Sequence, residues 1–369
     1  MDRITKLVLC VIPNEVCNLK CGYCYISQVK GWTDPCNIRY SPEYIAACLS
    51  KKRIGGTALI NLTAKGETLL VNNITEIIKC FLMEGHYIEI VTNGTVTKKI
   101  KEILEFDNTL LERVFFKVSF HYAELVRLNA LDSFFANVDL IKESPASFTL
   151  ELMANDNLED SIETISKICK ERVGANCHAT IGRDDSIPQK PLLSKHSEIE
   201  FREKWKQLDS DMLEFKMEVL GKKRREFCYA GKWSIYVDLI TGEARQCYMQ
   251  PAIQNIYKNP NSPIHFWPVG YCCTLPYCVN AHSHLAWGLI PEIDTPYYYS
   301  MRNRTCDDGN NWLNDKFGSV SKKKLYEANK EYSKAKKLLF TIFIQPGIYL
   351  KGVVRNPYDI LSKMFKKAR

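Results

Sequence analysis

Long apolar runs are missing from this chain of 369 residues. The longest one, Leu338–Leu350, is interrupted at Gln345, Pro346 and Gly347, and falls short of the roughly 20 residues that a membrane-spanning helix needs. The first apolar run, Leu7–Ile12, is too short for the core of a secretion signal. These absences predict a cytoplasmic protein that does not cross a membrane, and they leave contact with a membrane surface open.

Internal repeats, heptads and low-complexity tracts are also missing, which excludes solenoid, coiled-coil and collagen-like architectures. What is present is an ordinary globular mixture, with 46% hydrophobic and 11% aromatic residues. The chain therefore has enough apolar material to bury a sizeable core.

Excess charge of one sign is confined to the end of the chain. Residues 322–369 hold thirteen Lys and Arg against three acidic residues, so the rest of the chain is slightly acidic despite the overall charge of +8. This balance argues against a nucleic-acid-binding body. In the predicted basic helix Tyr358–Arg369, apolar residues share one face, which is typical of a weak contact with an anionic membrane surface. Packing of that face on the protein body is an equally good interpretation.

Strand-like and helix-like segments alternate through the first two-thirds of the chain. Six strands are predicted, at Lys6–Ile12, Ala58–Thr63, Tyr87–Thr92, Val114–Phe120, Phe148–Met153 and Cys177–Ile181. Helices are predicted at Pro42–Lys51, with Ser41 as its N-cap, and at Asn72–Glu84, Lys98–Phe106, Phe134–Lys142, Leu158–Arg172 and His196–Leu208. Six βα units predict an α/β fold with a parallel sheet, whose functional groups lie at the carboxyl ends of the strands.

The pattern changes after about residue 215, where Cys, Gly, Pro and aromatic residues accumulate and helices become rare. We expect a core at residues 1–215, a small loop-rich unit at 216–310 and a basic helical tail at 311–369. The tail includes a predicted helical segment at Ser321–Leu339.

Fifteen cysteines suggest that some thiols bind metal, and three of them form a C-x3-C-x2-C loop directly after the first strand. These are Cys17, Cys21 and Cys24. A zinc ion would require a fourth ligand, for which Cys36 is the nearest candidate. A 4Fe–4S cluster held by three thiolates would instead keep one iron open for chemistry.

This loop, its place after the first strand and the aromatic Tyr23 before its last cysteine resemble the radical SAM superfamily. The resemblance implies a partial (β/α)6 barrel in which Cys17, Cys21 and Cys24 bind a 4Fe–4S cluster and the open iron binds S-adenosylmethionine. It also implies reductive cleavage to a 5′-deoxyadenosyl radical, with an electron donor such as flavodoxin or ferredoxin. The residues implied in cofactor binding are Tyr23, Gly66, Glu67, Thr92, Asn93 and Ser119, although Lys65 and Thr68 depart from the family's Gly-Gly-Glu-Pro segment.

A second cysteine group begins with Cys228 and Cys247, which flank Gly242 at the spacing of a SPASM or twitch extension of the same superfamily. A hairpin, with Trp233–Asp238 turning through Thr241 and Gly242, is expected to bring the two thiols together. The resemblance implies one auxiliary 4Fe–4S cluster. Its expected ligands are Cys228, Cys247, one of Cys272 and Cys273, and Cys278, with His282 and Cys306 in reserve. Structural zinc or unliganded thiols are the alternatives.

Polar residues at the remaining strand ends are candidates for substrate contact. They are His121, Tyr122, Glu124 and Arg183, together with Glu151, Asp184 and Asp185. The leading hypothesis is a radical SAM enzyme that modifies a small-molecule or glycan-like substrate. Maturation of a ribosomally made peptide is the alternative, which the short segment before the first strand disfavours. A non-catalytic iron–sulfur or zinc protein is the hypothesis from another class.

Overall fold

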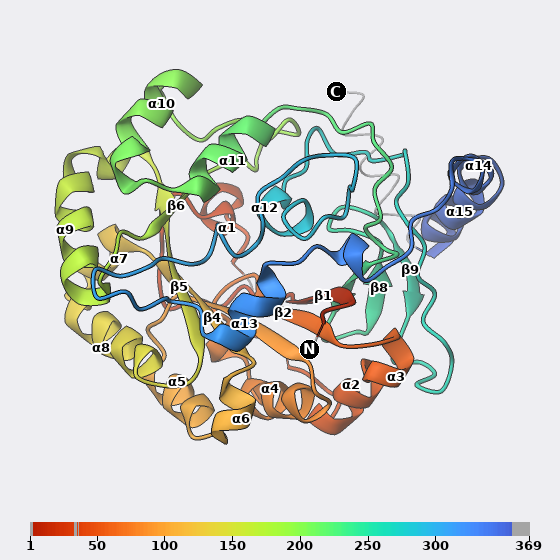
Figure 1. Ribbon diagram of the computed structural model, residues 1–369, viewed down its shortest axis with the longest axis horizontal. Helices are drawn as coiled ribbons and strands as arrows, with labels where there is room; N and C mark the ends of the chain where they lie inside the picture. Colours follow the sequence, from red (N-terminus) through yellow and green to blue (C-terminus); the bar gives the residue numbers. More distant parts are fainter. Residues whose placement is uncertain (1–2, 33–34, 36, 356–369) are drawn as a thin grey trace.

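A single nine-stranded sheet organises the protein, in a computed structural model that describes residues 3–32, 35 and 37–355 (Figure 1). The strand order is β6-β5-β4-β3-β2-β1-β7-β8-β9. Their bounds are β1 Lys6–Ile12, β2 Ala58–Ala64, β3 Tyr87–Thr92, β4 Val114–Phe120, β5 Ser147–Ala154, β6 His178–Ile181, β7 Ser234–Asp238, β8 Glu243–Arg245 and β9 Ala252–Asn255. Cys36 and the predicted helix Tyr358–Arg369 lie outside the described residues.

Neighbouring strands from β1 to β6 pair in parallel, because helical connections return the chain to the same end of the sheet. All six predicted strands are confirmed, and their bounds shift by no more than one residue. The helices are α1 Tyr25–Val29, α2 Pro42–Cys48, α3 Lys51–Ile54, α4 Ile74–Met83, α5 Thr97–Leu104, α6 Asn108–Leu111, α7 Tyr122–Arg127, α8 Leu131–Lys142, α9 Ile162–Val173, α10 Glu198–Trp205, α11 Asp211–Val219, α12 Ala281–His284, α13 Asp315–Ser321, α14 Lys334–Leu339 and α15 Gln345–Arg355. The predicted N-cap is also confirmed, since the Ser41 side chain accepts from the Tyr44 N–H.

Alternation along the strands separates an apolar face from a polar one. On β1 to β4, residues such as Val8, Ile60, Ile88 and Phe116 are fully buried in the hydrophobic core. The residues between them point to the opposite face and line a cavity; from β2 to β4 these include Asn61, Thr63, Glu89 and Lys117. Helices such as α4, α5 and α8 cover the outer face of the sheet (Figure 1). The apolar side chains of that face are therefore buried in the core, and the polar ones face the cavity.

Strands β7 to β9 extend the same sheet beyond β1. Strand β7 pairs with β1 in parallel, and β8 returns antiparallel to β7, which confirms the hairpin expected at Thr241 and Gly242. Gly242 has φ +73°, and a Cβ there would lie 2.3 Å from the Tyr257 ring, so only glycine fits this turn. The hairpin carries the chain from Cys228 to Cys247.

The chain around α13 covers the amino-terminal end of the sheet. Phe317 stacks on Phe115 at the start of β4, with ring centroids 4.7 Å apart. The Asn314 side chain donates to the carbonyls of Glu112 and Pro145, which precede β4 and β5. The loops that follow β1, β2 and β3 lie at the opposite end of the sheet, where Cys17, Gly66 and Asn93 line one cavity.

The helix expected over Ser321–Leu339 is wrong in its first part, because α13 ends at Ser321 and α14 begins only at Lys334. Between them, the buried Lys324 ammonium donates to the carbonyls of Ala286, Thr295 and Pro296 at 2.6 to 2.9 Å. These tertiary hydrogen bonds hold the segment in a turn and override its helical pattern.

The residues that interrupt the apolar run, Gln345 to Gly347, lie inside the last helical segment. The chain runs from Lys334 to Arg355 through α14, a π-helical turn at Phe340–Ile344 and α15. Pro346 has no N–H to donate to the preceding turn of the helix. The π-helical turn lies directly before it and accommodates this missing hydrogen bond without ending the helix. Within the part of the chain that the structure describes, no helix is long and apolar enough to cross a bilayer.

Candidate functional site

Three cysteine thiols meet directly after β1. Cys17, Cys21 and Cys24 line one cavity of about 310 Å³ at the carboxyl ends of the strands. Cys24 is the N-cap residue of α1 and donates its N–H to the Cys21 carbonyl at 3.1 Å, so one turn places both residues. Burial raises the pKa of Cys17, and it raises the pKa of Cys21 to about 12. These two thiols therefore stay protonated at neutral pH unless they bind a cation. This donor set fits a metal centre.

The loop after β2 docks on the cysteine loop through its backbone. The N–H of Gly66 donates to the Asn14 carbonyl at 2.7 Å, and that of Glu67 donates to the Val16 carbonyl at 2.9 Å. A Cβ at position 66 would lie 2.1 Å from the Val16 carbonyl oxygen. Close approach of the two loops therefore requires glycine at this position.

Glu67 is buried and accepts hydrogen bonds from three neighbours. Its Oε1 accepts from the Leu69 N–H at 2.9 Å and the Thr92 hydroxyl at 2.6 Å, and its Oε2 accepts from the Asn93 N–H at 2.7 Å. Asn93 in turn directs its side-chain amide to Cys17 Sγ, at 3.7 Å. Burial raises the pKa of Glu67, and the three hydrogen bonds oppose that shift. Three predicted cofactor-binding residues thus form one network that ends at a cysteine.

Most of the other predicted site residues lie in the same cavity. Besides the cysteines, its walls include Tyr23, Gly66, Glu67, Thr92, Asn93, Ser119, His121 and Arg183. The Tyr23 hydroxyl lies 2.6 Å from His121 Nδ1, and burial lowers the pKa of His121 to about 4, so the imidazole is neutral at pH 7.

Two predicted catalytic residues are not among the residues that line this cavity. Both belong to α7, which turns the chain away after His121. Tyr122 packs edge-on against Phe120, and Glu124 accepts from the Lys20 N–H at 3.0 Å and pairs with Arg127. Their surroundings indicate packing and loop anchoring.

A second cavity, of about 300 Å³, adjoins the first one on the inner face of the sheet. The two cavities share walls that include Thr63, Lys65 and Arg183. Sequence reasoning missed Lys117 and Glu89, which line the second cavity, and Lys216 of α11, which lines the first. Charged residues inside otherwise apolar strands were the available signal for Lys117 and Glu89.

Four thiols of the second cysteine group line one small cavity together with His284. They are Cys228, Cys247, Cys273 and Cys278. Burial and the neighbouring thiols raise the pKa of Cys278 well above its usual value, and burial raises that of Cys247 to about 12. His284 Nδ1 lies 3.8 Å from Cys247 Sγ. These donors fit a second metal centre.

The remaining candidates of this group lie elsewhere. Cys272 is exposed and lines a different pocket, next to the α14–α15 helix. Cys306 is buried against α9, with its Sγ 3.2 Å from the Val173 carbonyl, and His282 faces the second cavity of the sheet. The structure therefore brings Cys273, and not Cys272, to the other three thiols.

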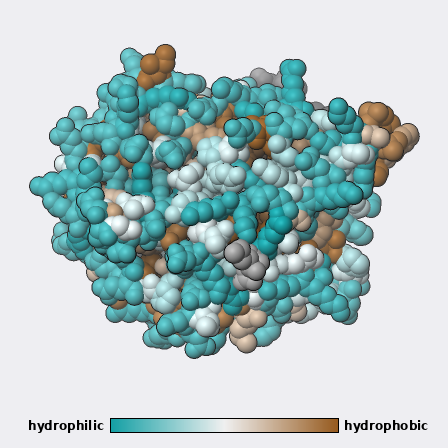
Figure 2. Space-filling model, in the orientation of Figure 1, coloured by the Kyte–Doolittle hydropathy of each residue, from teal (hydrophilic) through white to brown (hydrophobic). Residues whose placement is uncertain are grey.

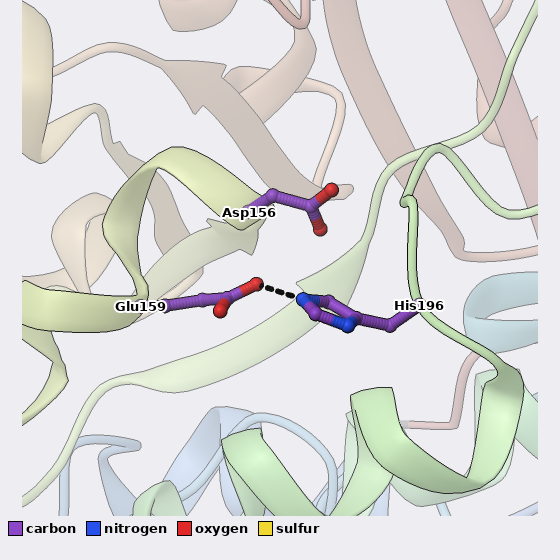
Figure 3. A group of neighbouring side chains, drawn as sticks. All are labelled: Asp156, Glu159 and His196. Atoms are coloured by element: carbon purple, nitrogen blue, oxygen red, sulfur yellow. Dashed lines mark hydrogen bonds and ion pairs between the residues drawn. The ribbon is translucent and has the colours of Figure 1, made fainter.

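Asp156, Glu159 and His196 form a compact group of potential metal ligands (Figure 3). Each is already engaged: His196 Nε2 lies 2.6 Å from Glu159, Lys204 pairs with the same carboxylate at 2.8 Å, and Asp156 accepts from Ser194 and Lys195. A cation at this position would compete with the Lys204 ammonium. The group is better explained as an anchor that holds the segment before α10 against the turn after β5.

No protein-family profile and no curated protein matches the sequence. Among solved structures, Streptococcus suis SuiB bound to S-adenosylmethionine is similar, with a TM-score of 0.50 and 13% identity over 70% of this chain and 64% of SuiB. The chain thus spans less than two-thirds of that structure. Weaker similarities are to anSMEcpe with bound AdoMet and Cp18Cys peptide (TM-score 0.46, 15% identity, 69% and 79% coverage) and to BtrN in complex with AdoMet and 2-DOIA (0.38, 16%, 70% and 80%). The similarity to SuiB shows that this chain shares the fold of that S-adenosylmethionine-bound protein.

Proposed function

We propose that this protein is a radical SAM enzyme with a partial (β/α)6 barrel. Cys17, Cys21 and Cys24 would hold a 4Fe–4S cluster, and S-adenosylmethionine would occupy the same cavity. The observation that carries this proposal is the convergence of three thiols, the buried Cys21 and the half-buried Cys17 and Cys24, with the Glu67–Asn93 network in one cavity, in a fold shared with SuiB. When bound and reduced, the cluster and S-adenosylmethionine would supply a 5′-deoxyadenosyl radical.

The chain's own residues would orient and shield this chemistry. The residues proposed to contact S-adenosylmethionine are Tyr23, Gly66, Glu67, Thr92, Asn93 and Ser119, all of which line the cavity. Thr92 and Asn93 both donate to Glu67, so the chain itself orients the loop after β3. An electron donor of the flavodoxin or ferredoxin kind would complete the reaction.

One auxiliary 4Fe–4S cluster at Cys228, Cys247, Cys273 and Cys278, in a SPASM- or twitch-like unit, is the second part of the proposal. The four thiols line one small cavity, so they would supply the four thiolate ligands that a 4Fe–4S cluster needs. A structural zinc bound by the same four thiols is the alternative.

The substrate is proposed to be a small molecule or a glycan-like group. The second cavity, of about 300 Å³, adjoins the proposed S-adenosylmethionine site and matches the size of small-ligand pockets. A ribosomally made peptide that inserts one side chain there is the alternative. Oxidation, epimerisation or another modification would follow hydrogen abstraction.

Anaerobic reconstitution tests the main proposal. Protein with rebuilt clusters, given dithionite and S-adenosylmethionine, should release 5′-deoxyadenosine and methionine. Cys21→Ala should abolish this release, whereas Cys272→Ala should retain it, because Cys272 lies outside both proposed cluster sites. Iron binding without 5′-deoxyadenosine release would favour a non-catalytic iron–sulfur protein, and stoichiometric zinc would favour a zinc protein.

A weak contact with an anionic membrane surface is proposed for the α14–α15 helix, which projects from the body in Figure 1. Its exposed side chains include Leu338, Ile342 and Phe343, the last of them 73% exposed, and Figure 2 shows an apolar patch at this place. Lys334 and Lys336 lie on the same helix. Exposed apolar residues beside lysines suit the interface of an anionic leaflet.

A further inference from the structure

The walls of the two adjoining cavities carry more cations than carboxylates able to neutralise them. Three of these cations, Lys117, Arg183 and Lys216, have side chains that face the cavities. Lys117 projects from the inner face of β4, Arg183 follows β6, and Lys216 comes from α11, which packs on β6 through Ser210. Three separate elements therefore direct positive charge to one place.

The carboxylates nearby are already engaged by other groups. Glu151 pairs with the fully buried Arg302, and Asp185 pairs with Lys190. Glu89 accepts from the Tyr298 hydroxyl at 2.6 Å and from Asn61 at 2.8 Å. Each carboxylate thus has a partner from outside the set of three cations.

The cations themselves find mostly neutral partners. The Lys216 ammonium donates to the Thr180 hydroxyl at 2.8 Å, and Arg183 donates to the Val279 carbonyl at 2.8 Å. Lys117 lies 3.6 Å from the Glu151 carboxylate that Arg302 occupies. His282 Nδ1 is buried at the edge of the same cavity and has no hydrogen-bond partner among the described residues.

This arrangement lowers the pKa values of both lysines. Burial, followed by the charges of Arg183 and Lys117, lowers the pKa of Lys216 well below its usual value. Burial and the charge of Arg302 lower the pKa of Lys117 to about 7. Glu89 opposes the shift of Lys117 and Asp185 opposes that of Lys216, but neither carboxylate outweighs the effects that lower the two pKa values. Buried like charges that share too few counterions destabilise a fold, and such a site is suited to a ligand of opposite charge.

We infer that the substrate of the activity proposed above carries an anionic group, a carboxylate or a phosphate, that binds between Lys117, Lys216 and Arg183. The identification of the ligand as a substrate rests on the proposed function, whereas the anion site itself follows from the charges of the cavity walls. An anion here would neutralise the surplus charge and accept hydrogen bonds from the three side chains. It would also lie beside the cavity of Cys17, Cys21 and Cys24.

Anion binding by the reconstituted holoprotein, with saturating S-adenosylmethionine, tests the site. Inorganic phosphate and acetate are titrated separately by calorimetry at pH 6.5 and low ionic strength. We expect at least one of the two to bind, and its affinity to fall at least tenfold in both Lys117→Met and Lys216→Met. Lys216→Arg should bind within threefold of the wild type, and so should the control Lys222→Met, which alters an exposed lysine just after the same helix.

Three results would overturn the inference. The first is that neither anion binds, and the second is that binding is equal in all variants. The third is a tenfold loss of S-adenosylmethionine affinity in the two Met variants, since the cations would then serve the carboxylate of that cofactor. Release of 5′-deoxyadenosine by the wild type is measured separately, so a failure of the proposed function is distinguishable from a failure of the anion site. Glu151 keeps Arg302 as its partner when Lys117 is replaced. Because the lowered pKa values of Lys117 and Lys216 mean that each charge destabilises the fold, the Met variants should melt at or above the wild-type temperature.

Discussion

The Glu67 carboxylate accepts the backbone N–H of Asn93 at 2.7 Å, and this contact joins the loop after β2 to the loop after β3. Asn93 then reaches Cys17 through its side chain, while Glu67 donates its own N–H to Val16 of the cysteine loop. Three loops at the carboxyl end of the sheet are therefore held together by the chain's own hydrogen bonds. Substitutions at Glu67 and at Gly66 test this junction.

Replacement of the Glu67 carboxylate by an amide should destabilise the protein. In Glu67→Gln the side-chain NH2 must face one of three donors, from Leu69, Thr92 or Asn93, so one buried hydrogen bond becomes a repulsive contact. We expect a loss of about 1–3 kcal/mol in the free energy of unfolding, measured by urea denaturation. Glu105→Gln, on an exposed residue, is the control. Equal stability of the two variants would show that the network contributes nothing.

Added volume at the loop junction should disrupt the cysteine loop. Gly66→Ala would place a Cβ 2.1 Å from the Val16 carbonyl oxygen, whereas Gly22→Ala, inside the cysteine loop itself, meets no atom within 4 Å. We expect Gly66→Ala to lower both the melting temperature and the iron bound after reconstitution, and Gly22→Ala to change neither. Normal iron content in Gly66→Ala would contradict the proposed dependence of the cluster site on this contact.

Iron binding by the second cysteine group should depend on Cys273 and not on the adjacent Cys272. In a background with Cys17, Cys21 and Cys24 replaced by Ala, we expect about four irons per chain. Further replacement of Cys273 should remove this iron, because Cys273 shares a cavity with Cys228, Cys247 and Cys278, whereas replacement of Cys272 should not. The measurement is iron and sulfide analysis of the anaerobic protein. Equal loss in both variants would argue against the assignment of Cys273, and no iron in the triple variant would argue against an auxiliary cluster.

The lowered pKa of Lys117 should make the free energy of unfolding of the protein depend on pH. This pKa of about 7 lies below the usual 10.5, so between these values the unfolded chain binds a proton that the folded chain does not, and stability rises with pH. The Lys117→Met variant lacks this slope. We therefore expect its advantage in melting temperature over the wild type to be largest at pH 6.5 and to narrow by pH 9.

The charged and titratable groups facing Lys117 include Glu89, Glu151, Arg302, Lys216 and His282. Loss of the Lys117 charge also raises the pKa values of Lys216 and His282 in the folded protein, which adds to the advantage of the variant at low pH. A constant difference between the two melting temperatures from pH 6.5 to pH 9 would contradict the lowered pKa of Lys117.

The exposed face of the α14–α15 helix should bind anionic vesicles weakly and reversibly. We expect co-sedimentation with phosphatidylserine-containing vesicles and not with neutral ones, and loss of binding at high salt. Phe343→Ser, at the most exposed apolar residue of the π turn, should reduce binding. Met83→Ser, at a residue 71% exposed on α4, is the matched control. Negligible sedimentation of the wild type with both vesicle types would exclude the membrane contact.

Local pattern was enough to predict much of this protein. The period-2 strands, the helices between them, the N-cap at Ser41 and the hairpin at Gly242 follow from short-range sterics and hydrogen bonding, which neighbouring residues determine. The cysteine loop after β1 is equally local, because Cys17, Cys21 and Cys24 lie within eight residues. Parallel strands then bring the loops that follow them to one edge, so Glu67, Asn93 and Ser119 could be expected near those thiols.

Contacts between segments that are distant in the sequence determine the other features, which local pattern does not encode. Whether Cys272 or Cys273 joins Cys228 depends on how a loop folds back over the sheet, and spacing along the chain does not encode that choice. Lys324 keeps its segment out of the predicted helix through carbonyls some 30 residues away. The cationic wall arises in the same way, since Lys117 and Lys216 come from different elements and only their packing turns two isolated lysines into one electrostatic site.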